Sequence, residues 1–350
     1  MLAACAVPSS GTPDSKLEAL TASCQEELDA IHAAGSFPGA TASLVLADGR
    51  VVRLAVGNTE QGGRPLTPED RMLVGSVGKT WVAAIIHQLA AKGMVEYDSK
   101  AVEWFHEDDW YLRIPNAGEV TLRQLLRHQS GLERYEFKPE FWKELMLDPD
   151  RVWHPQELLA FVFDDQPMFP AGEGWAYADT NYILLGMIIE RATGRRFYDL
   201  AEDWINRPHR FKDTIASDQR RLVGVVQGTV KAGRQLGVGP FTLSDGVFTY
   251  NVQFEWCGGG FASTSTDLAR WAWLLFSERL LGKDGVAAML DAVPAPELGP
   301  GRAYGLGVIL TDTRLGQLRG HDGFMPGYLT TMGYFPESGI AAAIQVNTDA

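Results

Sequence analysis

Segments with the character of β-strands lie near both ends of the 350-residue chain, and a long stretch of helical character separates them. Residues 40–46 and 51–56 flank Asp48-Gly49, a pattern typical of a hairpin with a tight turn. Strand segments recur near the C-terminus, at 304–311, 328–335 and 340–346. Residues 82–207 are mostly helical in pattern. This order predicts one antiparallel sheet that both ends of the chain complete.

The predicted fold class is α/β of the α+β type, in which helices flank the antiparallel sheet and a second lobe is all helical. Residues 15–80 and 257–350 form the predicted sheet domain, and residues 81–256 form the inserted lobe, after a leader and linker at 1–14. Predicted helices at 15–34, 121–127 and 181–193 are each followed by glycine within a few residues. A cleft between the lobes is the expected place for a ligand.

The charge of the chain excludes some classes of partner. Its 44 acidic and 31 basic residues give a formal net charge of -13, which argues against nucleic acid and anionic membrane surfaces. No apolar run reaches the length of a bilayer-spanning helix. Residues 106–109 combine a histidine with three acidic residues, but neighbours on a turn rarely converge on one ion. No metal site is predicted there.

The three cysteines, Cys5, Cys24 and Cys257, form neither a CxxC pair nor a zinc-binding spacing, and the pairing of Cys24 with Cys257 stays open. Leu2-Ala3-Ala4-Cys5 resembles the lipobox of bacterial lipoproteins, and a linker-like stretch with Pro and Ser follows it. The charged and apolar regions of a signal peptide do not precede it. The resemblance implies an exported periplasmic or cell-envelope protein, which a lipid on Cys5 could tether to a membrane.

A serine and a lysine stand three residues apart at Ser76 and Lys79. Residues 81–90 contain no Pro or Gly, which favours a helix that begins here. Residues i and i+3 share a helix face, so Ser76 Oγ and Lys79 Nζ are expected to meet at its first turn. A serine hydroxyl is a weak nucleophile until a base takes its proton, and a desolvated lysine can serve as that base.

Two other motifs overlap this stretch and do not fit it. A phosphate-binding loop ending in Gly78-Lys79-Thr80 requires glycine at the position of Leu73. The nucleophile motif Gly-x-Ser-x-Gly requires glycine at the position of Val74. Ser-x-x-Lys also occurs by chance in chains of this length. Partner residues elsewhere in the chain must therefore show whether this serine and lysine are catalytic.

Four further stretches accompany Ser76 and Lys79, at 125–132, 177–182, 258–269 and 320–328. In order and spacing, the five stretches together resemble the serine β-lactamase-like family. That family contains class C β-lactamases, penicillin-binding DD-carboxypeptidases, D-aminopeptidases and related esterases. The resemblance covers about residues 36–347, and it is specific for the family rather than for a substrate.

The resemblance implies roles for the matching residues. Ser76 would be the acylated nucleophile and Lys79 its basic partner. Tyr177 would help to accept the serine proton and later activate water, so Lys79 and Tyr177 would titrate as a coupled pair. The backbone N–H groups of Ser76 and Phe324 would form an oxyanion hole, which contributes about 3–4 kcal/mol of transition-state stabilisation per donor.

His321 and Gly323 would match the Lys-Thr-Gly element on the strand beside the cleft, with histidine in place of lysine. The lysine holds a substrate carboxylate, whereas a histidine of uncertain charge near neutral pH holds it less firmly. Family members with His-x-Gly resemble peptidases more than β-lactamases. His128 also matches a family position and is interpreted as structural support beneath the cleft.

Asp179 stands where the family has the asparagine of Tyr-x-Asn. An amide can donate to a substrate carbonyl, whereas a carboxylate can only accept, which is unfavourable beside the acyl-amide oxygen of a β-lactam. If Asp179 pairs with Lys79, it stabilises the ammonium form and shifts the role of base toward Tyr177. The alternative is that Asp179 faces away from the site.

The sequence stops at Ala350, just after the last predicted strand. Family members usually continue into a helix that packs on the sheet. Without a covering element, an apolar face of the sheet is expected to be exposed.

The predicted protein is a serine hydrolase that needs neither metal nor organic cofactor. Its predicted substrate is a small molecule or peptide, of the DD-peptidase type or a D-amino-acid peptide or amide. A carboxylesterase is the first alternative and a class C-like β-lactamase the second. Two further hypotheses belong to other functional classes. One is a binding protein that has lost catalytic turnover, and the other is an acyltransferase. The acyl group, the leaving group and the oligomeric state stay undetermined.

Overall fold

An eight-stranded antiparallel sheet organises the computed structural model, which describes residues 13–350. Its strand order is β2-β1-β13-β12-β11-β10-β9-β8, so the N-terminal hairpin pairs with the last strand of the chain. The strands are β1 (Gly39–Val45), β2 (Val51–Gly57), β8 (Val293–Pro294), β9 (Arg302–Tyr304), β10 (Ile309–Thr313), β11 (Gly316–Met325), β12 (Tyr328–Phe335) and β13 (Ile340–Val346). The predicted completion of one sheet by both ends of the chain is confirmed.

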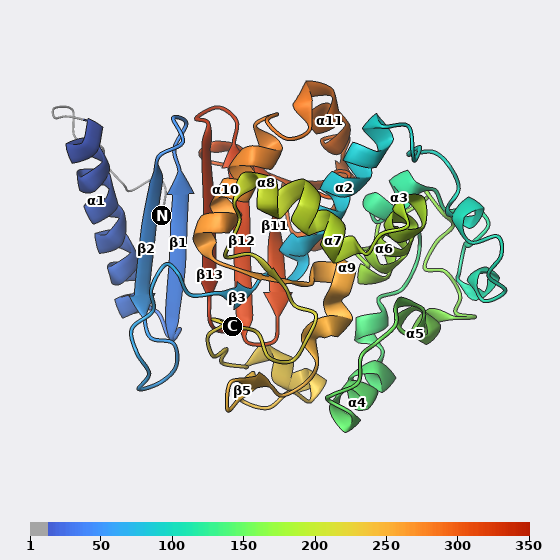
Figure 1. Ribbon diagram of the computed structural model, residues 1–350, viewed down its shortest axis with the longest axis horizontal. Helices are drawn as coiled ribbons and strands as arrows, with labels where there is room; N and C mark the ends of the chain where they lie inside the picture. The colour runs from blue at the N-terminus through green and yellow to red at the C-terminus, as the bar shows by residue number, and fades with distance from the viewer. Residues whose placement is uncertain (1–12) are drawn as a thin grey trace.

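Helices cover both faces of the sheet at its β1–β2 edge. α1 (Pro13–Ala34) buries Leu20, Cys24 and Leu28 against alternate residues of β1 and β2. α10 (Ser265–Phe276) packs on the opposite face, where Ser265 Oγ lies 3.0 Å from Ser43 Oγ. The other helices are α2 (Lys79–Ala91), α3 (Leu122–Leu126), α4 (Pro139–Leu147), α5 (Pro155–Leu159), α6 (Asp179–Thr193), α7 (Phe197–Ala201), α8 (Arg207–His209), α9 (Trp256–Gly259) and α11 (Gly282–Met289). Figure 1 shows α3, α4, α5 and α6 gathered on the side away from α1.

Short strands bring residues 72–73 and 261–263 together, although they are far apart in the sequence. β3 (Met72–Leu73) pairs with β7 (Phe261–Ser263), and β7 also pairs with β4 (Ile215–Ala216). A separate small hairpin consists of β5 (Leu243–Ser244) and β6 (Val247–Phe248), around the predicted turn at 245–246. The β3–β7 pairing places the turn that contains Ser76 beside the glycine-rich stretch 258–260.

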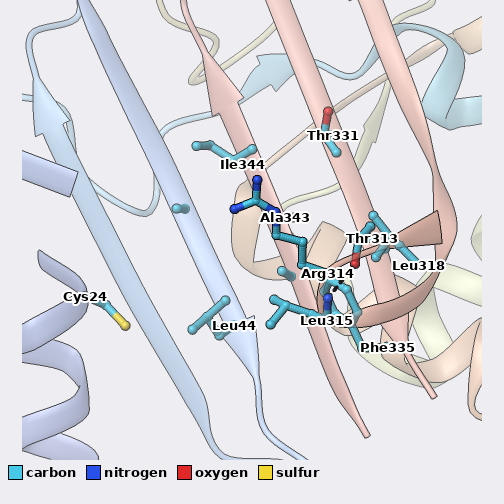
Figure 2. Close-up of a pocket in the computed structure, with 13 residues that line it drawn as sticks. Cys24, Leu44, Thr313, Arg314, Leu315, Leu318, Thr331, Phe335, Ala343 and Ile344 are labelled. Carbon is cyan, nitrogen blue, oxygen red and sulfur yellow. Dashed lines mark hydrogen bonds between the residues drawn. The ribbon is translucent and has the colours of Figure 1, made fainter. Parts of the chain in front are cut away.

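One face of the sheet is open next to α1. A cavity of about 400 Å³ lies there, and its apolar lining includes Leu44, Leu318 and Ile344. Figure 2 shows Leu44 between Cys24 on α1 and Leu315 in the β10–β11 loop. Leu318 and Ile344 are partly exposed, because α1 covers only the part of this face formed by β1 and β2.

Two predictions for the C-terminal strands differ from the structure. The predicted strand 304–311 is wrong in extent, since it is split into β9 and β10 at Gly305-Leu306-Gly307, where Gly307 has a φ of 87°. Strand β11 was not predicted from its own pattern. Its glycines at 316, 320 and 323 lower strand propensity, but two neighbouring strands supply the pairing.

The cysteine and membrane predictions are resolved only in part. Cys257 is a buried free thiol, so it does not pair with Cys24. The predicted lipid attachment at Cys5 and most of the linker after it lie outside the described residues. Along residues 13–350, no helix combines the length and the apolar character that crossing a bilayer requires.

Candidate active site

Ser76 and Lys79 meet where a tight turn leads into α2. Gly75–Gly78 forms a 3₁₀ turn, η1, and α2 begins at Lys79. Side chains three residues apart eclipse each other in a 3₁₀ turn, and Ser76 Oγ lies 2.9 Å from Lys79 Nζ. The structure therefore brings these two side chains together as expected, although the predicted α-helical start is replaced by this turn.

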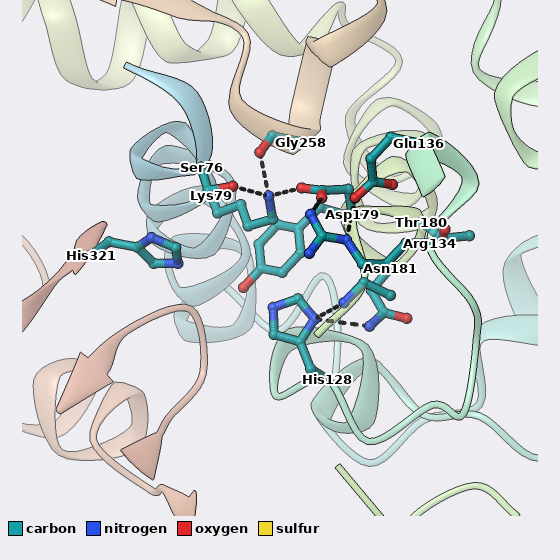
Figure 3. A network of polar contacts seen from close by, with 12 residues as sticks. Ser76, Lys79, His128, Arg134, Glu136, Asp179, Thr180, Asn181, Gly258 and His321 are labelled. Carbon is teal, nitrogen blue, oxygen red and sulfur yellow. Dashed lines mark hydrogen bonds and ion pairs between the residues drawn. The ribbon is translucent and has the colours of Figure 1, made fainter. Parts of the chain in front are cut away.

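Lys79 is fully buried and has three acceptors around its nitrogen. They are Ser76 Oγ, the carboxylate of Asp179 and the carbonyl oxygen of Gly258, the last at 2.5 Å. Figure 3 shows all three contacts converging on Nζ. An ammonium group has three N–H donors and no acceptor, so this arrangement matches a protonated lysine. Asp179 consequently faces the site and does not point away from it.

Two charged residues that sequence reasoning missed surround Asp179. Arg134 donates to Asp179 Oδ2 over 3.0 Å and also pairs with Glu136. Burial disfavours ionisation of Asp179, but the charges of Lys79 and Arg134 outweigh it and hold the pKa of Asp179 well below its ordinary value. Burial, followed by the charge of Asp179, raises the pKa of Glu136 well above its ordinary value. The charged run 133–136, directly after the matched stretch 125–132, is the signal that could have revealed them.

Tyr177 lies just before α6, against the ring of His128, with ring centroids 4.1 Å apart. His128 Nδ1 accepts hydrogen bonds from the backbone N–H of Ala178 and from the amide of Asn181, so His128 positions this segment. Tyr177 Oη is buried without a hydrogen-bond partner in the described chain. Burial and then the charge of Asp179 raise the pKa of Tyr177 well above its ordinary value, and the Ser76 hydroxyl acts in the opposite sense. The resting phenol is therefore neutral.

Both ring nitrogens of His321 are engaged. Nδ1 lies 2.6 Å from the carbonyl oxygen of Asp322, and Nε2 lies 2.9 Å from Tyr304 Oη. A carbonyl only accepts, so Nδ1 carries the proton and Tyr304 donates to Nε2. Burial, with the positive charge of Lys79, lowers the pKa of His321 to about 4. His321 is thus a neutral imidazole behind the site, and Figure 3 shows it apart from the network around Lys79.

Glycines let β11 pass directly beside the Ser76 turn. A Cβ atom added to Gly75 would lie 2.7 Å from the backbone nitrogen of Phe324. A Cβ atom added to Gly323 would overlap the carbonyl oxygen of Val74. Gly323 therefore permits a close approach of two backbones, and that approach puts Phe324 next to Ser76, as an oxyanion hole requires.

These elements define a class of protein. A serine, a buried lysine and a tyrosine gather where an antiparallel sheet meets helical segments, and a glycine-containing strand runs past the serine. This is the arrangement expected of the serine β-lactamase and penicillin-binding fold. The chain belongs to the beta-lactamase family, whose family model matches residues 24–350.

Relatives within this family include peptidases and penicillin-binding proteins. Penicillin-binding protein 4* of Bacillus subtilis strain 168 is 28% identical over 279 residues, which are 77% of this chain and 59% of that protein. A D-aminopeptidase of Brucella anthropi is 26% identical over 297 residues, which are 81% of this chain and 51% of that protein. The chain therefore spans between half and three fifths of the length of these curated relatives.

Solved structures resemble the chain over nearly its whole length. A D-stereospecific amidohydrolase from Streptomyces sp. has a TM-score of 0.80 at 28% identity, with 94% of each chain covered. The D-amino acid amidase from Ochrobactrum anthropi SV3, complexed with D-phenylalanine, has a TM-score of 0.79 at 27% identity. In that comparison 93% of this chain and 91% of the amidase are covered.

Proposed function

We propose that this protein is a serine hydrolase that forms an acyl-enzyme on Ser76, and that it acts on peptides or amides of D-amino acids. The observation that carries the proposal is the contact of Ser76 with Lys79 beside the unpartnered hydroxyl of Tyr177. Similarity to a D-aminopeptidase and to D-amino-acid-specific amidohydrolases supports the substrate class.

In the proposed reaction, the Lys79–Tyr177 pair first loses one proton to solvent. Ser76 Oγ then attacks the substrate carbonyl carbon, and its proton passes to this pair. Backbone N–H groups of Ser76 and Phe324 stabilise the negative oxygen of the tetrahedral intermediate. The C–N bond then breaks, the leaving amine takes the proton, and the acyl group remains on Ser76 as an ester. Water that has been deprotonated by the same pair attacks this ester and releases the acid.

The charges of the site favour substrates without a carboxylate beside the scissile bond. In the described chain, Lys79 and Arg134 are both paired with Asp179, and His321 is neutral with both nitrogens engaged. A penicillin or a peptide C-terminus carries a carboxylate that needs a free cation. The electrostatics therefore support an aminopeptidase or amidase over a DD-carboxypeptidase or a β-lactamase. A carboxylesterase is the second candidate, because an ester needs the same nucleophile and no additional cation.

The test compares wild type with Ser76→Ala on the D and L amides of one apolar amino acid. Product release and intact mass are followed together, with benzylpenicillin and a neutral ester as further substrates. We expect Ser76-dependent hydrolysis of the D amide and little reaction with the penicillin. Hydrolysis of the ester alone would favour the carboxylesterase, and consumption of the penicillin without a lasting adduct would indicate a β-lactamase. Activity that persists in Ser76→Ala would refute an acyl-enzyme on this serine.

We also propose an exported location, with a membrane tether through a lipid on Cys5. Similarity to a penicillin-binding protein supports a place at the cell envelope. Fractionation of cells that express wild type or Cys5→Ser tests the tether. We expect wild type with the membranes and the variant in the soluble extracellular or periplasmic fraction. Equal distribution of the two forms would refute lipidation at Cys5.

A further inference from the structure

The site carries more carboxyl groups than its own cations can pair. Lys79 is fully buried, Arg134 is partly buried, and Asp179 lies between these two cations. Arg134 Nε also donates a hydrogen bond to Oε1 of Glu136. The other carboxyl oxygen, Oε2, is buried and has no hydrogen-bond partner in the described chain. A third carboxyl group, on Glu255, forms neither a hydrogen bond nor an ion pair with residues 13–350. Around Lys79 and Arg134, carboxyl oxygens of the described residues therefore remain without a hydrogen-bond donor, whereas both of these cations are already paired.

Glu255 lies against the same glycine that contacts Lys79. One point, the position that a Cβ atom would take on Gly258, is 3.5 Å from Asp179 Oδ1 and 3.6 Å from Glu255 Oε2. A Cβ atom on Gly259 would come within 2.5 Å of both Glu255 Oε2 and the carbonyl oxygen of Gly75, the neighbour of Ser76. The absence of side chains at 258 and 259 therefore leaves room for this carboxyl group near the turn that holds Ser76.

The backbone that presents Glu255 is strained. Glu255 ends the 3₁₀ turn η8 (Val252–Glu255), and Trp256 follows with a φ of 35° and a ψ of -112°. A bulky residue at positive φ costs of the order of 1–3 kcal/mol, and such strain tends to persist where a functional position requires it. Glu255 itself is partly exposed, so its side chain is not sealed in the core.

We propose that Glu255 is a specificity-determining residue that binds the positively charged amino group on the acyl part of the substrate. The inference rests on the proposed function, which supplies an amino-acid acyl group on Ser76. Asp179 lies near the same glycine, Gly258, and contributes negative charge, but its oxygens are bound to Lys79 and Arg134. Glu255 is the carboxyl group that has no partner until the substrate arrives.

The raised pKa of Glu255 is consistent with a cationic partner supplied by a ligand. Burial and then the charge of Asp179 raise the pKa of Glu255 to about 8. A desolvated carboxylate without a counterion is unfavourable, and a cation at hydrogen-bond distance reverses that penalty. A substrate with a free ammonium group supplies this cation, whereas an N-acylated or deaminated analogue does not.

Binding rather than turnover tests the inference, so that it can fail independently of the proposed reaction. Titration calorimetry on the full chain in a Ser76→Ala background measures the affinity for D-phenylalaninamide and for 3-phenylpropanamide, the same skeleton without its amine. We expect the amine to bind about 10- to 100-fold more tightly, as a hydrogen bond to a charged group allows. Adding Glu255→Gln should remove most of that advantage and leave the affinity for 3-phenylpropanamide within about threefold, since glutamine keeps the size of the side chain but cannot form a carboxylate.

Glu26→Gln is the matched control, because Glu26 is exposed on α1 and the same change there should leave both affinities unaltered. Equal affinity for the two ligands, or an amine advantage that survives Glu255→Gln, overturns the inference. A parallel loss for both ligands also overturns it, since Glu255 would then only support the shape of the site. Absence of Ser76-dependent turnover, by contrast, counts against the proposed function and leaves the binding comparison valid.

Discussion

Tyr304 Oη lies 2.9 Å from Nε2 of His321, and this contact fixes the histidine as a neutral acceptor inside the protein. The ring has its other proton on Nδ1, which donates to the carbonyl oxygen of Asp322. A proton added to Nε2 would face a hydroxyl proton, so protonation requires this hydrogen bond to rearrange. The histidine that replaces the family lysine therefore adds no positive charge to the site at neutral pH.

The neutral histidines should make the protein less stable in mild acid. His321 and His87 are buried with pKa values of about 4, mainly because burial disfavours their charged forms. Between pH 4 and the ordinary value of 6.5, the unfolded chain binds protons that the folded chain does not. The free energy of unfolding therefore falls as the pH falls through this window. Urea denaturation of His87→Gln and of the double variant His87→Gln/His321→Gln should show slopes that are flatter by about 1.4 kcal/mol per pH unit for each histidine removed. Unchanged slopes would show that these histidines keep their ordinary pKa values in the folded protein.

Asp179→Asn should move the pH dependence of catalysis to lower pH. The negative charge of Asp179 raises the pKa of Tyr177, so its removal makes the Tyr177 hydroxyl easier to deprotonate. We expect the rate of ester hydrolysis to rise with pH, because the Lys79–Tyr177 pair has to lose a proton before it can accept one from Ser76. The measurement is kcat/KM for a neutral ester between pH 6 and 10. An ascending limb that stays in place or moves to higher pH would contradict this electrostatic role.

Arg134 and Asp179 should be coupled in stability. Breaking a buried ion pair by removing one partner typically costs about 3–5 kcal/mol, because the other charge is left without a partner. We expect Asp179→Asn to destabilise the fold by an amount of this order. The double variant Arg134→Met/Asp179→Asn should cost less than the two single variants added together, by about 0.5–3 kcal/mol. Urea denaturation at pH 7 gives all four unfolding free energies, and strict additivity would show that the pair makes no joint contribution.

Gly259→Ala should damage the site, whereas Gly239→Ala should not. A Cβ atom at 259 would lie 2.5 Å from the carbonyl oxygen of Gly75, so the turn that holds Ser76 would have to shift. Small displacements of reacting groups cost orders of magnitude in rate, and we expect kcat/KM to fall about 100-fold. The space around Gly239 is open, and its backbone conformation suits any residue, so alanine there is the control. Equal activity of the two variants in an ester assay would show that the Gly259 contact is not needed.

Local patterns were sufficient to predict the elements that have strong signals of their own. The β1–β2 hairpin, α1 and α6 have clear periodicity and clear end signals, and the structure places them within about two residues of the predicted bounds. Strand β11 has three glycines and was found only through its likeness to a family motif. Its strand conformation depends on hydrogen bonds from β10 and β12, and pairing of this kind leaves little trace in the strand's own sequence.

The catalytic residues could be predicted from the sequence, but the charged residues around them could not. Spacing and family likeness brought Ser76, Lys79 and Tyr177 to attention, and the structure places them together. Arg134 and Glu255 were not predicted, because a charged residue in a loop usually faces solvent. Their places beside Asp179 and Gly258 depend on contacts between segments far apart in the chain, and single-sequence patterns do not encode such contacts.

The strand order of the main sheet also determines when a newly made chain can become active. β1 is synthesised long before β13, the strand with which it pairs. The backbone of β11 that approaches Ser76 is likewise made long after Ser76 itself. Contacts between such distant segments form only after a large loop has closed, which slows folding. Until β11 and β13 have been made, the chain therefore exposes an unpaired edge of β1 and lacks the backbone that lies beside Ser76, so activity has to wait for both strands.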